Sequence, residues 1–185
     1  RAAPAPGLWP RARCQAARRH HPARRRHRLM ASLSLSLRPG DARDAGAVEA
    51  VMAAAFDPQW GEAWTRSQLL GVMALPGIQL TLAELGEEPA GFALTRSVMD
   101  EAELLLLGVV PDHRRGGVAS ALVERVMRDC AAAGVVTLHL EVRANNPAVH
   151  FYTRHGFAKC GERRNYYKGA DGRHYDAHTY QRAIG

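Results

Sequence analysis

The chain has 185 residues, of which 46% are hydrophobic, and this length and composition predict one globular domain rather than two. Its formal net charge is +7, but nine arginines and no acidic residue lie in residues 1–30, so the rest of the chain carries −2. The excess positive charge therefore belongs to the N-terminal arm, and we do not expect the folded part to bind nucleic acid.

The N-terminal arm, residues 1–30, is rich in Ala, Pro, Arg and His and has no apolar periodicity, so it is predicted to be disordered. It could tether the protein to nucleic acid or to an anionic surface, or act as a transit peptide. We favour a third interpretation, upstream sequence outside the natural protein, because Met30-Ala31-Ser32 would be a good start. The arm lacks the apolar stretch of a secretory signal, and we expect a cytoplasmic protein with no membrane partner.

The cysteines and histidines favour neither a disulfide framework nor a metal site. Cys14, Cys130 and Cys160 lie far apart in the sequence and form no C-x-x-C motif. The histidines include no pair with H-E-x-x-H spacing. We therefore expect free thiols and no bound metal.

The first patterned segments predict a strand followed by two helices. Residues 33–37 alternate between Leu and Ser, as in a half-buried strand, and Pro39-Gly40 ends the pattern. Asp41 can cap a helix that runs to about Phe56. A Trp-flanked loop over residues 60–64 either lines a pocket or packs against the sheet. Residues 65–70 form a second, short helix.

Three strands are predicted next. Residues 78–84 and 90–98 form a hairpin joined by the turn residues 86–89. The nearly continuous apolar run over residues 103–110 suits a central strand that is buried on both faces.

A turn with two glycines then leads into an amphipathic helix over residues 118–133. The backbone N–H groups at such a helix start are unpaired and the helix dipole favours negative charge, so the turn proposes a phosphorylated ligand. Neither G-x-x-x-x-G-K-[ST] nor G-x-G-x-x-G occurs in the chain, which argues against nucleotide hydrolysis and NAD chemistry.

The last segments predict strand, helix, strand, strand. Residues 136–143 alternate, which places Glu141 on the polar face of an otherwise buried strand. Pro147 lies near the first turn of a short helix that extends to Arg154. Two further strands are expected around residues 160–165 and 175–182.

The turn resembles the acetyl-CoA pyrophosphate loop of the GNAT superfamily of N-acetyltransferases. Arg114-Arg115-Gly116-Gly117-Val118-Ala119 fits the pattern [QR]-x-x-G-x-[GA], and Asn145-x-x-Ala148-Val149-x-x-Tyr152 and Gly156-Phe157 follow in the family's order. The resemblance implies an α/β fold over residues 31–185 with a mixed central sheet flanked by helices. It also implies acetyl-CoA as the acetyl donor, held where the middle strands splay.

Within the superfamily the chain most resembles the RimI-type ribosomal-protein-alanine N-acetyltransferases. The signals are Leu140-Glu141-Val142-Arg143 and Arg163-Arg164-Asn165-Tyr166-Tyr167, followed by Asp171-Gly172-Arg173 and Asp176-Ala177. The resemblance implies that the acceptor is the N-terminal alanine of a small-subunit ribosomal protein. It also suggests that residues 163–167 shape the peptide groove, although an ordinary exposed strand would look the same.

The resemblance assigns the catalytic roles to two residues. An α-amino group is mostly charged at neutral pH, and Glu141 is the candidate base that removes its proton, directly or through water. Tyr152 is the candidate acid that protonates the departing thiolate. The alternatives are a strand carboxylate that pairs with Arg143 and a helix tyrosine that only packs.

The resemblance assigns the acetyl-CoA contacts to one strand, one loop and one asparagine. It implies that a backbone N–H of the strand over residues 107–109 donates to the developing oxyanion, and that the loop over residues 114–119 faces the pyrophosphate. Asn145 contacts the cofactor, with Asn146 as the alternative, and the loop could instead be a solvated basic turn. The assigned residues are Leu107, Gly108, Val109, Arg114, Arg115, Gly116, Gly117, Val118, Ala119 and Asn145.

Two other functions fit the same residues. The fold does not determine the acceptor, which could be a lysine side chain or a small amine. A module that binds CoA or is tethered to nucleic acid by the arm, with idle catalytic residues, is the non-enzymatic alternative.

Overall fold

The computed structural model describes residues 34–185, and the arm predicted at residues 1–30 lies outside them. The predicted order of strands and helices is confirmed. In chain order the elements are β1 (Leu35–Gly40), α1 (Ala45–Ala55), α2 (Arg66–Met73), β2 (Ile78–Leu85), β3 (Glu88–Val98), β4 (Glu101–Val109), α3 (Val118–Ala132), β5 (Thr137–Arg143), α4 (Ala148–Arg154), β6 (Ala158–Lys168) and β7 (His174–Ala183).

The strands form one seven-stranded sheet in the order β1-β2-β3-β4-β5-β7-β6. All neighbouring strands are antiparallel except β4 and β5, which run parallel. A parallel pair needs a crossover, and α3 provides it between these two strands. The predicted mixed α/β sheet is therefore confirmed.

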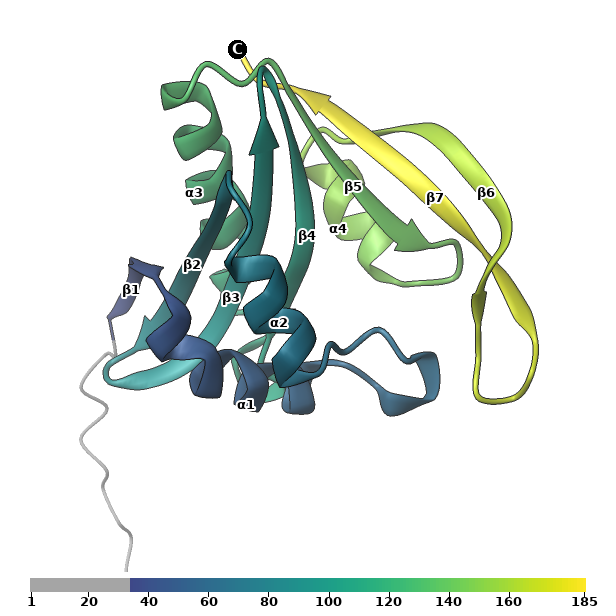
Figure 1. Cartoon of the computed structure of the whole chain (residues 1–185), viewed down its shortest axis with the longest axis horizontal. Helices are drawn as coiled ribbons and strands as arrows, with labels where there is room; N and C mark the ends of the chain where they lie inside the picture. Colours follow the sequence, from purple (N-terminus) through teal and green to yellow (C-terminus); the bar gives the residue numbers. More distant parts are fainter. Residues whose placement is uncertain (1–33) are drawn as a thin grey trace, which may run out of the picture. The chain divides into compact units, whose positions relative to one another are not determined.

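Helices cover both faces of the sheet (Figure 1). On one face α1 and α2 pack Val48, Met52 and Leu69 against side chains from β2, β3 and β4. On the other face α3 and α4 pack in a cluster that includes Leu122 and Tyr152. The sheet is therefore packed between two hydrophobic clusters, in which the helices bury their apolar sides against the strands.

A β-bulge in β4 positions the central feature of the fold. Leu94 of β3 pairs with Leu106 and Thr95 pairs with Leu104, so Leu105 is an additional residue in β4. The bulge reverses the alternation of side chains: Leu104 packs in the α3 cluster, whereas Leu106 packs in the α1 cluster. The sequence predicts that this strand is buried on both faces, but Leu105 and Leu107 are only half-buried.

β4 and β5 separate at the same level. Their pairing runs from Glu101 and Thr137 to Leu104 and Leu140, and no further pair is formed between them within the described residues. The strands diverge beyond this point, as Figure 1 shows for the lower part of the sheet. The splay expected from the family resemblance is present, and it opens the sheet beside the bulge.

Two strands, β1 and β3, each include a proline that the sequence pattern placed in a turn. β1 continues through Pro39 to Gly40, because β1 is an edge strand in which a residue without an N–H is tolerated. The hairpin between β2 and β3 uses only the two residues between Leu85 and Glu88, and Pro89 joins β3 beside a second bulge. The turn predicted at residues 86–89 is therefore tighter than expected.

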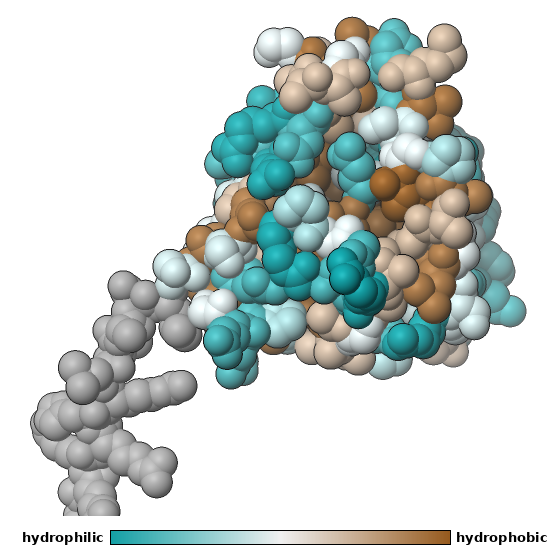
Figure 2. Space-filling model, turned by 60° about the vertical axis from the view of Figure 1, so that its left-hand side comes forward, coloured by the Kyte–Doolittle hydropathy of each residue, from teal (hydrophilic) through white to brown (hydrophobic). Residues whose placement is uncertain are grey.

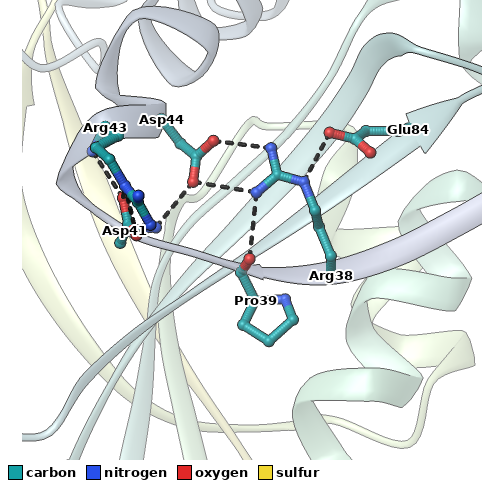
Figure 3. Close-up of polar contacts among 6 residues, drawn as sticks. All are labelled: Arg38, Pro39, Asp41, Arg43, Asp44 and Glu84. Carbon is teal, nitrogen blue, oxygen red and sulfur yellow. Dashed lines mark hydrogen bonds and ion pairs between the residues drawn. The ribbon is translucent and has the colours of Figure 1, made fainter.

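The start of α1 is tied to β1 and β2 by Arg38 (Figure 3). The Arg38 guanidinium donates to both carboxylate oxygens of Asp44, at 2.8 and 3.1 Å, and to Glu84 at 2.8 Å. These contacts lower the pKa of Asp44. Asp41 caps the 3-10 turn Ala42–Asp44, which leads directly into α1, in a capping box with Asp44. The predicted cap is therefore present, but it lies one turn before the α-helix that it was predicted to start.

The surface carries mixed polarity. Figure 2 shows hydrophilic residues interspersed with hydrophobic ones on the side that faces left in Figure 1. None of the helices in residues 34–185 is long and apolar enough to span a membrane. Cys130 is buried and Cys160 is exposed, and both are free thiols.

Candidate active site

The gap between β4 and β5 is hollowed into two adjoining cavities. The first, of about 430 Å³, lies beside Arg114 and Ala119 and is called the loop-side cavity. The second, of about 380 Å³, lies beside Glu141, Tyr166 and Tyr167 and is called the strand-side cavity. The residues that line both cavities are Phe56, Glu62, Leu107, Arg143, Asn146, Ala148 and Tyr152.

Glu141 projects from β5 into the strand-side cavity, as the alternation of that strand predicts. Its side chain is 14% exposed, and its Oε2 has no hydrogen-bond partner among the described residues. Burial raises the pKa of the Glu141 carboxyl, Arg163 lowers it and Glu103 raises it further. A carboxylate without hydrogen-bond donors and with a raised pKa is suited to accept a proton.

Glu141 does not pair with Arg143, the partner named in the alternative interpretation of Glu141 as an ordinary strand carboxylate. Nη2 of Arg163 lies 2.7 Å from Glu141 Oε2, an ion pair that lacks hydrogen-bond geometry. Arg143 pairs with Glu62 instead, with Nε and Oε1 3.1 Å apart. The expected pair between Glu141 and Arg143 is therefore absent.

Tyr152 projects from α4 and lines both cavities. Its side chain is buried, and its ring makes edge contacts with Phe151 and Phe157. Burial, with a smaller contribution from the Glu62 carboxylate, raises the pKa of the phenol. The hydroxyl therefore stays protonated at neutral pH and can donate a hydrogen bond.

A buried arginine forms the wall between the two cavities. Arg143 is 4% exposed, its guanidinium lies 3.5 Å from the centroid of the Trp60 ring, and its Nη1 donates to Asn145 Oδ1. Trp60 in turn makes an edge contact with Tyr175 of β7. The Trp-flanked loop thus lines the cleft, which supports the pocket interpretation of that segment.

The turn before α3 presents a row of backbone donors. Within the described residues, no backbone N–H group of residues 115–120 donates to an acceptor of this chain. Arg115 and Gly117 have φ of +63° and +86°, and a Cβ built on Gly117 would meet no atom within 4 Å. Successive free N–H groups at the start of a 15-residue helix are an arrangement suited to an anion.

Arg114 secures this turn. Its Nε donates to Val109 O at 3.2 Å and its Nη2 to Ala55 O at 2.8 Å. These bonds tie the loop to the end of β4 and to α1. The guanidinium was predicted to face pyrophosphate, and it does line the loop-side cavity, but backbone carbonyls already occupy two of its donors.

The family model described as acetyltransferase (GNAT) family matches residues 46–157, more than half of the chain. The chain belongs to the GNAT acetyltransferase family. A [ribosomal protein bS18]-alanine N-acetyltransferase from Escherichia coli K12 is 46% identical over 85 residues, which are 45% of this chain and 57% of that protein. The chain thus matches little more than half the length of this relative.

Two further comparisons cover more of the GNAT domain. The enzyme with the same name from Salmonella typhimurium is 39% identical over 115 residues, 62% of this chain and 76% of that protein. The crystal structure of the ribosomal-protein-S18-alanine N-acetyltransferase from Escherichia coli has a TM-score of 0.74 and 30% identity. The matched region covers 82% of this chain and 95% of the Escherichia coli chain.

The structure brings about half of the predicted GNAT site residues into the cleft. Glu141 and Tyr152 both line the strand-side cavity, and Tyr152 also lines the loop-side cavity. Of the residues assigned to acetyl-CoA, those in the wall of the loop-side cavity are Leu107, Gly108, Val109, Arg114 and Ala119. Arg115, Gly116 and Gly117 are exposed at the turn outside both cavities, and Val118 is buried in the core.

The asparagine assigned to acetyl-CoA does not reach the cleft. Asn145 is exposed and accepts from Arg143, whereas Asn146 lines both cavities and its Oδ1 caps Ala148 N at 2.9 Å. The assignment therefore moves by one residue.

The sequence patterns predicted no site role for Arg143, Glu62 or Phe56. Arg143 ends the L-E-V-R signature, two residues after Glu141, and this position is a signal that could have identified it. Glu62 and Phe56 come from the segment between α1 and α2, and no pattern in the sequence predicts that this segment crosses the end of β5.

Proposed function

We propose that this chain is an acetyl-CoA-dependent N-acetyltransferase that acetylates the N-terminal alanine of a small-subunit ribosomal protein. The observation that carries the proposal is the meeting of Glu141 and Tyr152 in one cleft where β4 and β5 diverge. The names of the relatives from Escherichia coli and Salmonella typhimurium support the acceptor.

The loop-side cavity and the turn at residues 114–119 fit the acetyl donor. Acetyl-CoA would supply the activated acetyl group as a thioester. The free N–H groups at the start of α3 suit its pyrophosphate, and the open space above Gly117 allows close approach of the backbone. Leu107, Gly108 and Val109 offer backbone groups along the splayed edge of β4, and Asn146 would replace Asn145 as the polar side chain.

Glu141 would act as the base. An α-amino group has a pKa of about 7.7 to 8.0 and must lose a proton before its lone pair can attack. The Glu141 carboxylate would take that proton, directly or through water. The new N–C bond then forms as the C–S bond breaks, and the electron pair of that bond leaves on sulfur. The nitrogen loses its second proton to water or to the departing thiolate, which leaves a neutral amide.

Tyr152 would stabilise the departing sulfur. Its raised pKa keeps the phenol protonated, so it acts as a hydrogen-bond donor to the thiolate. A thiol has a lower ordinary pKa than a phenol, about 8.5 against about 10, so a hydrogen bond is favoured over complete proton transfer.

The strand-side cavity suits the acceptor peptide. Tyr166 and Tyr167 of β6 line it together with Phe56, Trp64 and Glu103. An acidic, aromatic cavity is suited to a cationic N-terminus with a small first side chain.

The proposal is tested with the full chain, acetyl-CoA and matched peptides, with CoA release as the readout. One peptide starts with a free alanine and contains no lysine, the second is the same peptide with a blocked N-terminus and one lysine, and the third starts with a bulky residue. We expect turnover of the first peptide only. Equal turnover of the second would contradict the α-amine acceptor and favour a lysine side chain instead.

A further inference from the structure

Arg163 is the residue that covers the candidate base. Its Nη2 lies 2.7 Å from Glu141 Oε2, and its side chain is 59% exposed although the carboxylate is only 14% exposed. The guanidinium also lies 4.8 Å from the centroid of the Tyr166 ring. A largely exposed cation therefore covers a mostly buried carboxylate.

An irregular stretch of β6 follows directly after Arg163. Arg163 pairs with Ala177 and Tyr167 with Tyr175, so three residues of β6 bulge opposite a single residue of β7. Asn165 within the bulge has φ of +54°, and its N–H donates to Asp176 Oδ1 at 2.8 Å. The bulge turns both Tyr166 and Tyr167 into the strand-side cavity beside Arg163.

The other groups around Glu141 cannot balance its charge. Glu103 faces it from β4 and is itself acidic, and Tyr167 faces it from β6 as a neutral phenol. Thr179 is its neighbour on β7. On β5 itself, His139 lies near Glu101 and Arg143 is paired with Glu62. Among the described residues, Arg163 is thus the cation in contact with the Glu141 carboxylate.

We propose that Arg163 is a positioning residue that guards Glu141 and gives up its place to the ammonium group of the acceptor. Resting on the proposed function, this inference follows from the contact that Arg163 makes with Oε2: the ammonium group of the acceptor must approach the same carboxylate that the guanidinium covers. Arg163 holds the carboxylate ionised before the acceptor arrives, and its exposed side chain can then swing into solvent.

This exchange of cations has a consequence for selectivity. An acceptor with a free, charged N-terminus replaces the charge that Arg163 withdraws. A blocked N-terminus leaves Glu141 uncompensated in a buried site, which is unfavourable. The exchange of Arg163 for the acceptor therefore selects for a cationic amine before the chemical step.

The test compares Arg163→Ala and Arg163→Lys with Arg66→Ala, in the full chain. Arg66 is the matched control, because its side chain is 57% exposed and pairs with Glu49, not with Glu141. Steady-state kinetics with the alanine-initiated peptide measure KM and kcat, and NMR titration of the Glu141 carboxyl carbon measures its pKa without turnover.

We expect Arg163→Ala to lower the peptide KM by about twofold to fivefold with kcat retained, as for loss of a half-exposed competing ion pair. The pKa of Glu141 should rise, which moves the acid limb of kcat/KM to higher pH, and Arg163→Lys should restore both values. A higher KM would overturn the proposal, because Arg163 would then bind the acceptor. An unchanged KM with an unchanged Glu141 pKa would also overturn it, whereas a parent chain that does not acetylate the peptide would disprove the proposed function instead.

Discussion

The guanidinium of Arg143 stacks on the indole of Trp60, 3.5 Å from the ring centroid, and joins the end of β5 to the segment between α1 and α2. The same guanidinium pairs with Glu62 at 3.1 Å. The two ends of this contact are far apart in the sequence and together form the wall shared by the two cavities. Arg143 therefore links the stability of the domain to the shape of the cleft.

Replacing Arg143 by Met should lower the free energy of unfolding by about 3 kcal/mol, because the Glu62 carboxylate, 17% exposed, loses its counter-ion. Chemical denaturation of the variant measures this loss. The double variant Arg143→Met, Glu62→Gln should lose less than the single variant, since no unpaired charge remains. Additive losses from the two substitutions would show that the ion pair contributes little.

Gly117→Ala tests the anion-binding turn. The substitution forces alanine to φ of +86°, which costs about 1 kcal/mol, and places a methyl group in the open space above the turn. We expect acetyl-CoA to bind about tenfold more weakly, equivalent to about 1.4 kcal/mol, by calorimetric titration.

Gly134→Ala is the matched control for that variant. Gly134 follows the other end of α3, has φ of +79°, and likewise has no atom within 4 Å of a built Cβ. It should lose the same stability with unchanged acetyl-CoA affinity. Equal affinity losses in the two variants would mean that backbone strain, not ligand contact, explains the effect.

Tyr152→Phe should reduce kcat by about 10²-fold, the scale for removal of one hydrogen-bond donor that stabilises charge in the transition state. Folding should be little affected, because Phe keeps the edge contacts with Phe151 and Phe157. The control is Tyr180→Phe, a buried tyrosine of β7 that lines neither cavity. A similar kcat for both variants would remove Tyr152 from the mechanism.

Glu141→Gln should stabilise the fold at neutral pH. Burial raises the pKa of Glu141 in the folded protein, so folding disfavours the ionised form and the parent loses stability as pH rises through that pKa. The melting temperature of the variant should exceed that of the parent at pH 7, and the difference should vanish below about pH 4. A difference that grows on acidification would mean that the carboxylate is stabilised by folding.

The features that the sequence predicts correctly are local. The Asp41 cap, the alternation that aims Glu141 out of β5, and the turn before α3 each depend on a few neighbouring residues. Such signals act within one element, so they survive packing. The order of elements and the mixed sheet follow from them together with the family resemblance.

The features that the sequence does not predict depend on contacts between distant segments. The extra residue Leu105 in β4 is visible only from its pairing with β3, and the run of leucines there shows no break. The partner of Arg143 is Glu62, and the partner of Glu141 is Arg163. Which charges meet is decided by the sheet order, in which β7 lies between β5 and β6.

The proposed mechanism depends most directly on Glu141 as the base. The decisive measurement is the turnover of the alanine-initiated peptide by Glu141→Gln, alongside its acetyl-CoA affinity and the same values for Glu101→Gln, an exposed carboxylate on β4. We expect kcat to fall by about 10² to 10⁴-fold in Glu141→Gln with acetyl-CoA affinity retained, and Glu101→Gln to match the parent. Parental turnover by Glu141→Gln across the pH range would contradict the account.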